Sequence, residues 1–347
     1  MSLPTVSPIP AVSAPADAPL AAVVIGRNEG ARLIACLASL RGQTARIVYV
    51  DSGSSDGSPE AARGLGAEVL ALDMSRPFTA ARARNVGWRR ALERWPDTAL
   101  LQFVDGDCEL DPGWLPAASA FLAAHADVVA VCGRRRERHP EASVYNRLCD
   151  EEWATPVGEA KACGGDVLMR AAPLAAVGGY RDSLIAGEEP ELCVRLRRAG
   201  GRIWRLDAEM TRHDAAMRRF GQWWQRSRRA GHAFAEGAAL HGAPPERHWV
   251  TETRRALLWG LVLPAAGLLG LVFGITALAV LLLAYPLQWL RLARRAGPPS
   301  AALPDTAGWR LRRAGFGVLC KFAEAAGVLT YALRRLRGGP GRLIEYK

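Results

Sequence analysis

The stretch Val50–Ser58, VDSGSSDGS, decides the fold that this sequence predicts. The apolar run Ile47–Val50 leads directly into Asp51, and serines, glycines and a second aspartate follow. A short apolar run bounded by turn residues is typical of a buried strand. We therefore expect a strand that presents a carboxylate at the point where it ends.

Strand and helix patterns alternate around this stretch. Apolar runs predict strands at residues 21–26, 46–51, 68–73 and 99–105. Apolar residues spaced by three and four predict helices at residues 31–43, 59–67 and 78–95. This alternation predicts an α/β fold with a mostly parallel sheet covered by helices on both faces.

Polar side chains follow three of these strands. Asp51 and Asp105 close two of them, and Arg27, Asn28 and Glu29 follow the first. Ligands of such sheets bind beyond the carboxyl ends of the strands, so we expect a site there. A single aspartate at a strand end is also compatible with a simple stop facing solvent.

The segment DGD, Asp105–Asp107, is the candidate metal site. In extended geometry residues i and i+2 project to the same side, so both carboxylates would face one ligand, while Gly106 lets the backbone turn tightly between them. Mg²⁺ or Mn²⁺ is commonly held by one or two carboxylates together with substrate phosphates. The sequence therefore predicts a site for a metal-bound diphosphate.

Composition limits the class of protein. The 347 residues are 50% hydrophobic, which supports a packed core, and the formal net charge of +11 favours anionic partners. Seven scattered cysteines without a CxxC pair predict reduced thiols rather than a disulfide framework or a zinc site. Residues 1–19 lack the basic start of a secretory signal, so we interpret them as a flexible leader.

The C-terminal third predicts membrane helices. Residues 256–290 carry no charge, and Pro264, Gly274 and Pro286 favour two short spans over one long helix. Arginines flank both ends, which places both ends in the cytoplasm, as a hairpin requires. Residues 315–336 contain Lys321 and Glu324, which favours an interfacial amphipathic helix over a third span. Residues 236–255 would be a juxtamembrane linker and residues 291–347 a basic tail.

Four motifs follow one another along the chain: VVIGRNEG at 23–30, VDSGSSDGS at 50–58, FVDGDCELDPGWL at 103–115 and GGYRDSLIAGEEPELCVRLRRAG at 178–200. Together they resemble the inverting family 2 glycosyltransferases of the GT-A fold, over residues 20–235. The resemblance implies that Asp51 contacts the base or ribose of a nucleotide-sugar donor. It also implies that Arg27, Asn28 and Glu29 line that pocket, while Asp105 and Asp107 hold the nucleotide and its Mg²⁺ or Mn²⁺, Asp107 being the closer metal ligand.

Inverting transfer needs a carboxylate base across the sugar from the metal. The segment GEEPELCVRLRRAGG places Glu188 and Glu189 at the start of a helix, where the dipole stabilises an ionised carboxylate. The family usually has Glu-Asp there, with the second residue as base. The resemblance therefore assigns the base to Glu189, and the change of residue leaves Glu188 as the alternative.

Weaker signals give further candidates. The resemblance implies acceptor or donor-sugar binding for Asp166, with a turn aspartate as the alternative, and metal binding for His213, with a structural histidine as the alternative. In the segment 220–234, Trp223 and Trp224 would form an acceptor platform and Arg226 would meet the diphosphate. An amphipathic helix at the membrane surface fits that segment as well. The run CGRRRERHP, 132–140, is expected to be a solvated loop.

The sequence thus predicts a metal-dependent glycosyltransferase on the cytoplasmic face of a bacterial inner membrane, with a lipid-linked or surface-glycan acceptor and membrane lipids as partners. A nucleotidyltransferase would carry a glycine-rich basic signature where this chain has VVIGRNEG. A dinucleotide-dependent oxidoreductase would need GxGxxG after the first strand, which is absent. A membrane scaffold or nucleic-acid binder would explain the charge but not the strand-end aspartates, so no nucleic-acid partner is expected.

Overall fold

The computed structural model describes residues 15, 17–298 and 302–338, and the chain divides into two compact units. The first unit comprises residues 1–138 and 153–215, and the second comprises residues 139–152 and 216–347. The predicted catalytic domain, residues 20–235, therefore extends past the boundary at Ala215. Most of the predicted leader, residues 1–14 and 16, lies outside the described residues.

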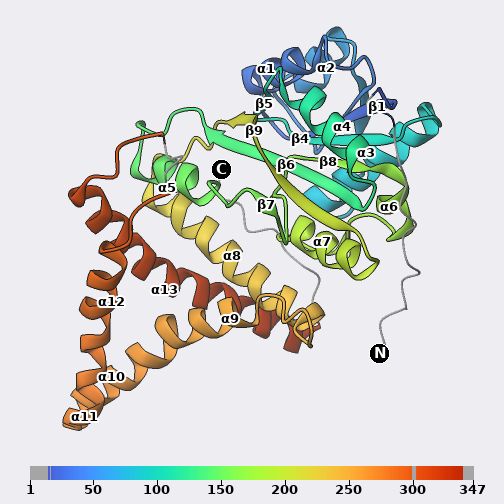
Figure 1. Cartoon of the computed structure of the whole chain (residues 1–347). Helices are drawn as coiled ribbons and strands as arrows, with labels where there is room; N and C mark the ends of the chain where they lie inside the picture. The colour runs from blue at the N-terminus through green and yellow to red at the C-terminus, as the bar shows by residue number, and fades with distance from the viewer. Residues whose placement is uncertain (1–14, 16, 299–301, 339–347) are drawn as a thin grey trace. The chain divides into compact units, whose positions relative to one another are not determined.

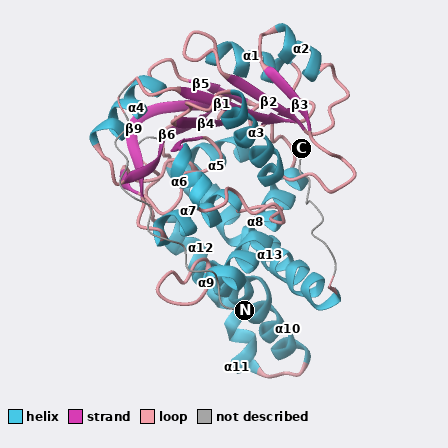
Figure 2. Ribbon diagram, turned by 90° about the vertical axis from the view of Figure 1, so that its right-hand side faces the viewer, coloured by secondary structure: helices cyan, strands magenta, loops and turns pink. Residues whose placement is uncertain are grey.

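The first unit is built on one sheet (Figure 2). Its strand order is β3-β2-β1-β4-β8-β6-β9-β5, and β7 pairs with β9. The strands are β1 Leu20–Gly26, β2 Ile47–Asp51, β3 Glu68–Ala71, β4 Leu100–Asp105, β5 Cys108–Leu110, β6 Val128–Glu137, β7 Gly158–Glu159, β8 Val167–Arg170 and β9 Arg202–His213. The strands β3, β2, β1 and β4 are parallel, whereas β8 pairs antiparallel with β4 and β6. The α/β prediction is confirmed, but the sheet is mixed beyond β4.

Helices cover both faces of this sheet. They are α1 Ala31–Leu40, α2 Ser58–Gly64, α3 Ala80–Arg94, α4 Trp114–Ala124, α6 Ala171–Ala176 and α7 Glu188–Arg198. Strand β1 alternates between two cores, since Val24 packs with Leu37 of α1 and Val23 packs on the face covered by α3. Gly87 of α3 lies against Val23, where a Cβ atom would collide with the valine. This close packing holds α3 firmly against the strands that lead to the predicted site.

The second unit is helical (Figure 1). Its helices are α5 Val144–Glu152, α8 Phe220–His241, α9 Val250–Leu257, the π-helical turn η1 Leu258–Val262, α10 Leu263–Val272, α11 Thr276–Ala279, the 3₁₀ turn η2 Val280–Leu283, α12 Ala284–Ala293 and α13 Ala307–Arg337. Gly231 of α8 packs against the backbone of Glu324, and Gly327 of α13 packs against the backbone of Arg228. These glycines let α8 and α13 approach closely along their lengths.

Three helices in the described part of the second unit are long and apolar enough to cross a membrane: Val250–Val272, Thr276–Ala293 and Ala307–Arg337. The first two are separated at Gly274, whose φ of 66° ends the helix, as the two-segment prediction requires. Large apolar side chains of these segments, such as Leu271 and Leu287, are more than half exposed. Such a continuous exposed apolar surface indicates contact with a membrane or a partner.

The run CGRRRERHP is not the solvated loop that its charge suggested. Residues 132–137 belong to strand β6, and Arg134 and Glu137 are buried. Arg135 forms ion pairs with carboxylates of the first unit, which removes the penalty of burying its charge.

Candidate functional site

The loop after β2 is folded around Asp51. Asp51 Oδ2 accepts hydrogen bonds from the backbone N–H groups of Gly53 and Ser54, at 3.0 and 2.9 Å. The hydroxyl of Tyr49 donates to Asp51 Oδ1, and burial followed by the Asp51 charge raises the pKa of Tyr49. The aspartate therefore shapes this loop at the carboxyl end of the sheet.

The loop after β1 is tied to the loop after β2. Asn28 adopts the left-handed conformation, with φ of 54°, and its Oδ1 accepts from Ser55 N while its own N–H donates to Ser54 Oγ. Arg27 lies over the ring of Phe78, 4.7 Å from its centroid. Glu29 pairs with Arg32 at 2.6 Å. The residues predicted to line a nucleotide pocket thus lie on two connected loops at one edge of the sheet.

Arg84 of α3 joins two of the predicted site carboxylates. Its guanidinium donates to Asp105 Oδ1 at 2.7 Å and to Glu188 Oε1 at 2.6 Å, and its side chain is 3% exposed. Arg135 contributes a second contact to Asp105, at 3.0 Å. Although burial alone would raise the pKa of Asp105, Arg84 and Arg135 hold it well below its usual range. Asp105 is therefore ionised but already neutralised by protein cations.

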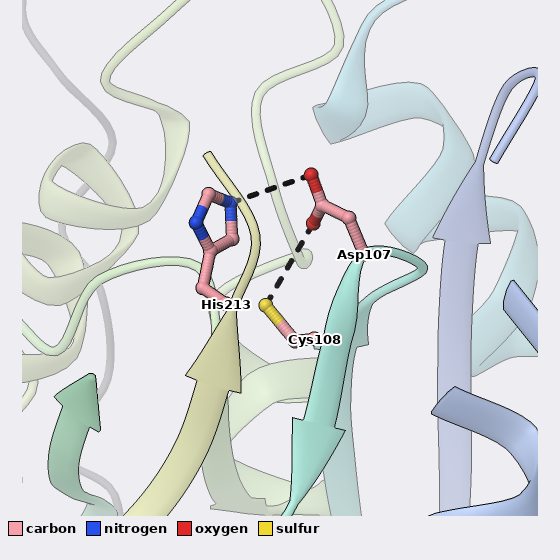
Figure 3. Close-up of side chains that lie close together, drawn as sticks. All are labelled: Asp107, Cys108 and His213. Carbon is pink, nitrogen blue, oxygen red and sulfur yellow. Dashed lines mark hydrogen bonds and ion pairs between the residues drawn. The ribbon is translucent and has the colours of Figure 1, made fainter. Parts of the chain in front are cut away.

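Asp107 has a different environment, because the chain turns at Gly106 and Asp107 between β4 and β5. The tight turn that Gly106 permits between the two aspartates is therefore present, so the strand does not continue in extended form through both of them. Instead, Asp107 Oδ2 lies 3.3 Å from His213 Nε2 at the end of β9 (Figure 3). Ligand atoms of Asp107, Cys108 and His213 all lie within 4.8 Å of one another.

The Asp107 and His213 pair fits a divalent cation. Burial, followed by the Arg135 charge, lowers the pKa of His213, which favours the neutral imidazole that a metal requires. His213 Nδ1 lies 3.7 Å from Glu137 Oε2, an arrangement that would leave Nε2 free to bind a metal. Burial raises the pKa of Cys108, so its thiol stays protonated and is a poor ligand for a hard cation.

Asp166 lies just before β8 and is held by contacts within the first unit, and its role in acceptor or donor-sugar binding stays a prediction. Its side chain is fully buried, and its oxygens accept from Asp105 N, Thr211 Oγ1 and Arg135. Asp166 thus fixes the end of β4 and orients Arg135.

Glu188 and Glu189 begin α7 but point into different surroundings. Glu188 pairs with Arg84, as described above. Glu189 is buried, and its two oxygens accept from the N–H groups of Cys163 and Gly164, at 2.7 and 2.8 Å, and from the Cys193 thiol. Burial raises the pKa of Glu189, although these hydrogen bonds oppose the shift.

The loop that contacts Glu189 also covers Asp105. A Cβ atom on Gly165 would lie 2.8 Å from Asp105 Oδ2 and 3.0 Å from Arg84, so only glycine fits without a shift. We call residues Cys163–Gly165 the cover loop. It lies over both the Arg84 ion pairs and the carboxylate of Glu189.

The candidates in 220–234 belong to the second unit. Arg226 forms a bidentate ion pair with Glu152, and its diphosphate contact stays a prediction. Trp223 is buried and packs against Tyr145, Phe220 and Phe316, so it is a core residue rather than an acceptor platform.

The sequence interpretation missed Arg84, Arg135 and Glu137. Arg84 lies among the buried alanines of α3, and a charged residue on the buried face of a helix is the signal that could have identified it. Arg135 and Glu137 were hidden inside a run of charges. Their partners lie on other strands, so local sequence carries no sign of the pairing.

Parts of this chain are similar to known proteins. Residues 22–161 match the sequence profile of Glycosyl transferase family 2. The succinoglycan biosynthesis protein ExoA of Rhizobium meliloti (strain 1021) is 29% identical over 196 residues, which cover 52% of this chain and 58% of that protein. The chain thus spans less than two thirds of that relative's length.

Among solved structures, the mannosyltransferase PcManGT from Pyrobaculum calidifontis, in complex with GDP-Man and Mn²⁺, has a TM-score of 0.55 at 18% identity, covering 91% of this chain and 86% of that chain. The Mycobacterium tuberculosis glucosyl-3-phosphoglycerate synthase, in complex with Mn²⁺ and UDP-glucose, has a TM-score of 0.48 at 17% identity, and the match covers 66% of this chain and 81% of that chain. The likeness to PcManGT supports the GT-A fold.

Proposed function

We propose that this chain, whose residues 22–161 match the Glycosyl transferase family 2 profile, transfers a sugar from a nucleotide-sugar donor to a hydroxyl acceptor with inversion. The observation that carries the proposal is the pairing of two clusters at one sheet edge. Asp105, Arg84 and Glu188 form one cluster, and Asp107 with His213 forms the other.

We assign the metal to Asp107 and His213. A bound Mg²⁺ or Mn²⁺ would neutralise the charge of the leaving diphosphate. The available ligands support this assignment: the carboxylate of Asp107 and the neutral imidazole of His213, whose other ring nitrogen lies near Glu137. The mannosyltransferase of similar fold also carries Mn²⁺ and GDP-Man in its structure.

Arg84 and Arg135 hold Asp105 in place at the donor side of the site. Asp105 is ionised and paired, so its part in our proposal is to orient the two guanidinium groups. A guanidinium that already lies at the site can also donate to diphosphate oxygens when the donor arrives. The loops around Asp51 and Asn28 would then hold the nucleoside.

We assign the role of the base to Glu189, and we propose that the cover loop controls access of the acceptor to its carboxylate. The raised pKa of Glu189 brings it closer to the range that a base needs at neutral pH. Its oxygens are occupied by the amides of Cys163 and Gly164, so the cover loop must move before an acceptor hydroxyl can reach them. Glu188 would keep Arg84 in position.

We further propose that the acceptor is a lipid-linked or surface glycan at the cytoplasmic face of a bacterial inner membrane. Two apolar segments joined at Gly274 and flanked by arginines support a hairpin with both ends in the cytoplasm. Helix α13 forms polar contacts with α8, from Arg228 to Thr330 and from Arg334 to Glu236, which favours an interfacial position. The relative ExoA is named for polysaccharide biosynthesis.

The test is to compare Glu189→Gln with Glu188→Gln in donor binding and turnover. We expect Glu189→Gln to keep donor binding and to lose turnover, because an amide cannot take up the acceptor's proton. The glutamine also loses the hydrogen bond from one N–H group of the cover loop, because its NH2 group cannot accept it. We expect Glu188→Gln to weaken donor binding, because Arg84 loses a partner. Normal turnover in Glu189→Gln would overturn the assignment of the base, and release of pyrophosphate instead of nucleoside diphosphate would favour a nucleotidyltransferase.

A further inference from the structure

The second unit contains a basic cavity that the proposed reaction does not use. Its volume is about 410 Å³, and it is lined by residues from α9, η1, α12 and α13 and by Arg295, which follows α12. Four of the lining residues are cationic: Arg255, Arg291, Arg295 and Lys321. None of the lining residues is acidic. We call this hollow the basic cavity.

Three of its cations are uncompensated. Lys321 pairs with Glu324 at 2.6 Å, but within the described ranges Arg255, Arg291 and Arg295 have no ion-pair partner. Like charges gathered around one hollow repel each other, so an anion there would be stabilised by all of them. Arginine side chains bind phosphate oxygens in bidentate geometry.

The remaining wall of the basic cavity is mainly apolar or aromatic, with Gln288 as its polar member. Trp259, Leu292 and Val318 contribute to the lining. The backbone carbonyl of Trp259 accepts a hydrogen bond from Tyr285 at 2.6 Å, which fixes η1 against α12. Gly260 lies against the backbone of Lys321, where any larger residue would push η1 away from α13. The cavity is thus a built feature with a charged side and an apolar side.

The position of the basic cavity in the sequence relates it to the membrane segments. Arg255 lies in the first turns of the first apolar segment, and Arg291 and Arg295 lie at and just beyond the end of the second. In a hairpin these two ends lie on the same side of the bilayer. Basic residues at that level meet the phosphate groups of lipids, and basic pockets between membrane helices bind lipid head groups.

We propose that the basic cavity binds the phosphate group of a membrane lipid, with the lipid chain lying along the apolar surface of the hairpin. The volume suits a phosphate or diphosphate head group, since ligand pockets commonly range from about 300 to 1,000 Å³. A free nucleotide would leave the apolar wall and the adjoining exposed apolar surface uncovered. A lipid phosphate matches both sides of the cavity at once.

The test uses native mass spectrometry of the full chain in nonionic detergent, titrated with phosphatidylglycerol, farnesyl phosphate or phosphatidylcholine. We expect one molecule of phosphatidylglycerol or of farnesyl phosphate to bind per chain and phosphatidylcholine to bind poorly. The tighter binder of the first two identifies the lipid class. The variant Arg255→Gln/Arg291→Gln/Arg295→Gln should weaken binding about 100-fold, since each basic residue near an anionic lipid contributes about 1 kcal/mol.

The matched control is Arg254→Gln/Arg294→Gln/Arg312→Gln, which removes the same charge from neighbouring residues that do not line the cavity. The control should keep its affinity, and equal circular dichroism melting curves of the two variants should show that both are folded. Equal loss of binding in both variants would reduce the effect to general surface charge and overturn the proposal. Displacement of the lipid by millimolar inorganic phosphate or nucleotide would overturn the lipid assignment.

Discussion

Replacing Arg84 by methionine tests the central ion-pair cluster, because Arg84 is the group that joins Asp105 to Glu188. Its side chain is 3% exposed and contacts the two carboxylates at 2.7 and 2.6 Å. Breaking a buried ion pair from one side costs about 3–5 kcal/mol, because a charge is left buried without its partner. Asp105 keeps its ion pair with Arg135, so we expect the free energy of unfolding at pH 7 to fall by an amount near the lower end of this range, about 3 kcal/mol.

The control for Arg84→Met is Arg90→Met on the same helix. Arg90 pairs with Glu68 and Glu93, but its side chain is 34% exposed, and exposed pairs contribute about 0–1 kcal/mol. The assay is urea unfolding of the detergent-solubilised chain, followed by tryptophan fluorescence. Equal midpoints for the two variants at pH 7 would refute the reasoning.

We also expect the effect of Arg84→Met on the free energy of unfolding to depend on pH. Asp105 has a folded pKa below its unfolded value, so its stabilisation is present above an unfolded pKa of about 3.9 and is lost as the pH falls toward the folded pKa. Arg84→Met removes one of the two arginines that lower this pKa. The difference in unfolding free energy between wild type and Arg84→Met should therefore be constant from pH 7 to about 5 and shrink below about pH 4.

Three further changes probe the metal, the base and the packing of the sheet. His213→Gln should weaken Mn²⁺ binding about 10- to 100-fold in calorimetry while Asp107 remains, and unchanged affinity would remove His213 from the metal site. Glu189→Gln should lower kcat about 10²- to 10⁴-fold with an unchanged donor Kd, whereas a raised Kd with an unaltered kcat would make Glu189 a structural residue. Gly87→Ala should cost about 1–3 kcal/mol in urea unfolding, because its Cβ would collide with Val23, and a wild-type midpoint would show that α3 can move away.

The sequence was sufficient for the strand and helix order of residues 20–105 and for the two-segment apolar region. Apolar runs such as Ile47–Val50 mark buried strands by composition alone, and glycine at 274 marks a helix end. The same patterns located Asp51, Asp105 and Asp107 at the carboxyl edge of the sheet. These features depend on local sequence, which is why a single sequence is enough to find them.

The arrangement of the site depended on contacts that local sequence does not carry. The DGD segment forms a turn, so Asp107 meets His213 from β9 instead of standing beside Asp105. The charge run in β6 looked solvated because the partners of Arg135, Asp105 and Asp166, come from other parts of the chain. The antiparallel pairing of β8 with β4 is equally remote in sequence.

We propose above that this chain performs metal-dependent glycosyl transfer. The most direct measurement is nucleoside diphosphate release by the detergent-solubilised full chain, given a panel of UDP-, GDP- and dTDP-sugars with lipid extract as acceptor source. Each donor is assayed with Mn²⁺ and with EDTA, beside Asp107→Ala and Glu189→Gln. We predict Mn²⁺-dependent release of nucleoside diphosphate from one donor, and we expect both variants to lose this release. Release that persists in EDTA or in Asp107→Ala would contradict this prediction, as would the absence of both donor binding and release across the panel.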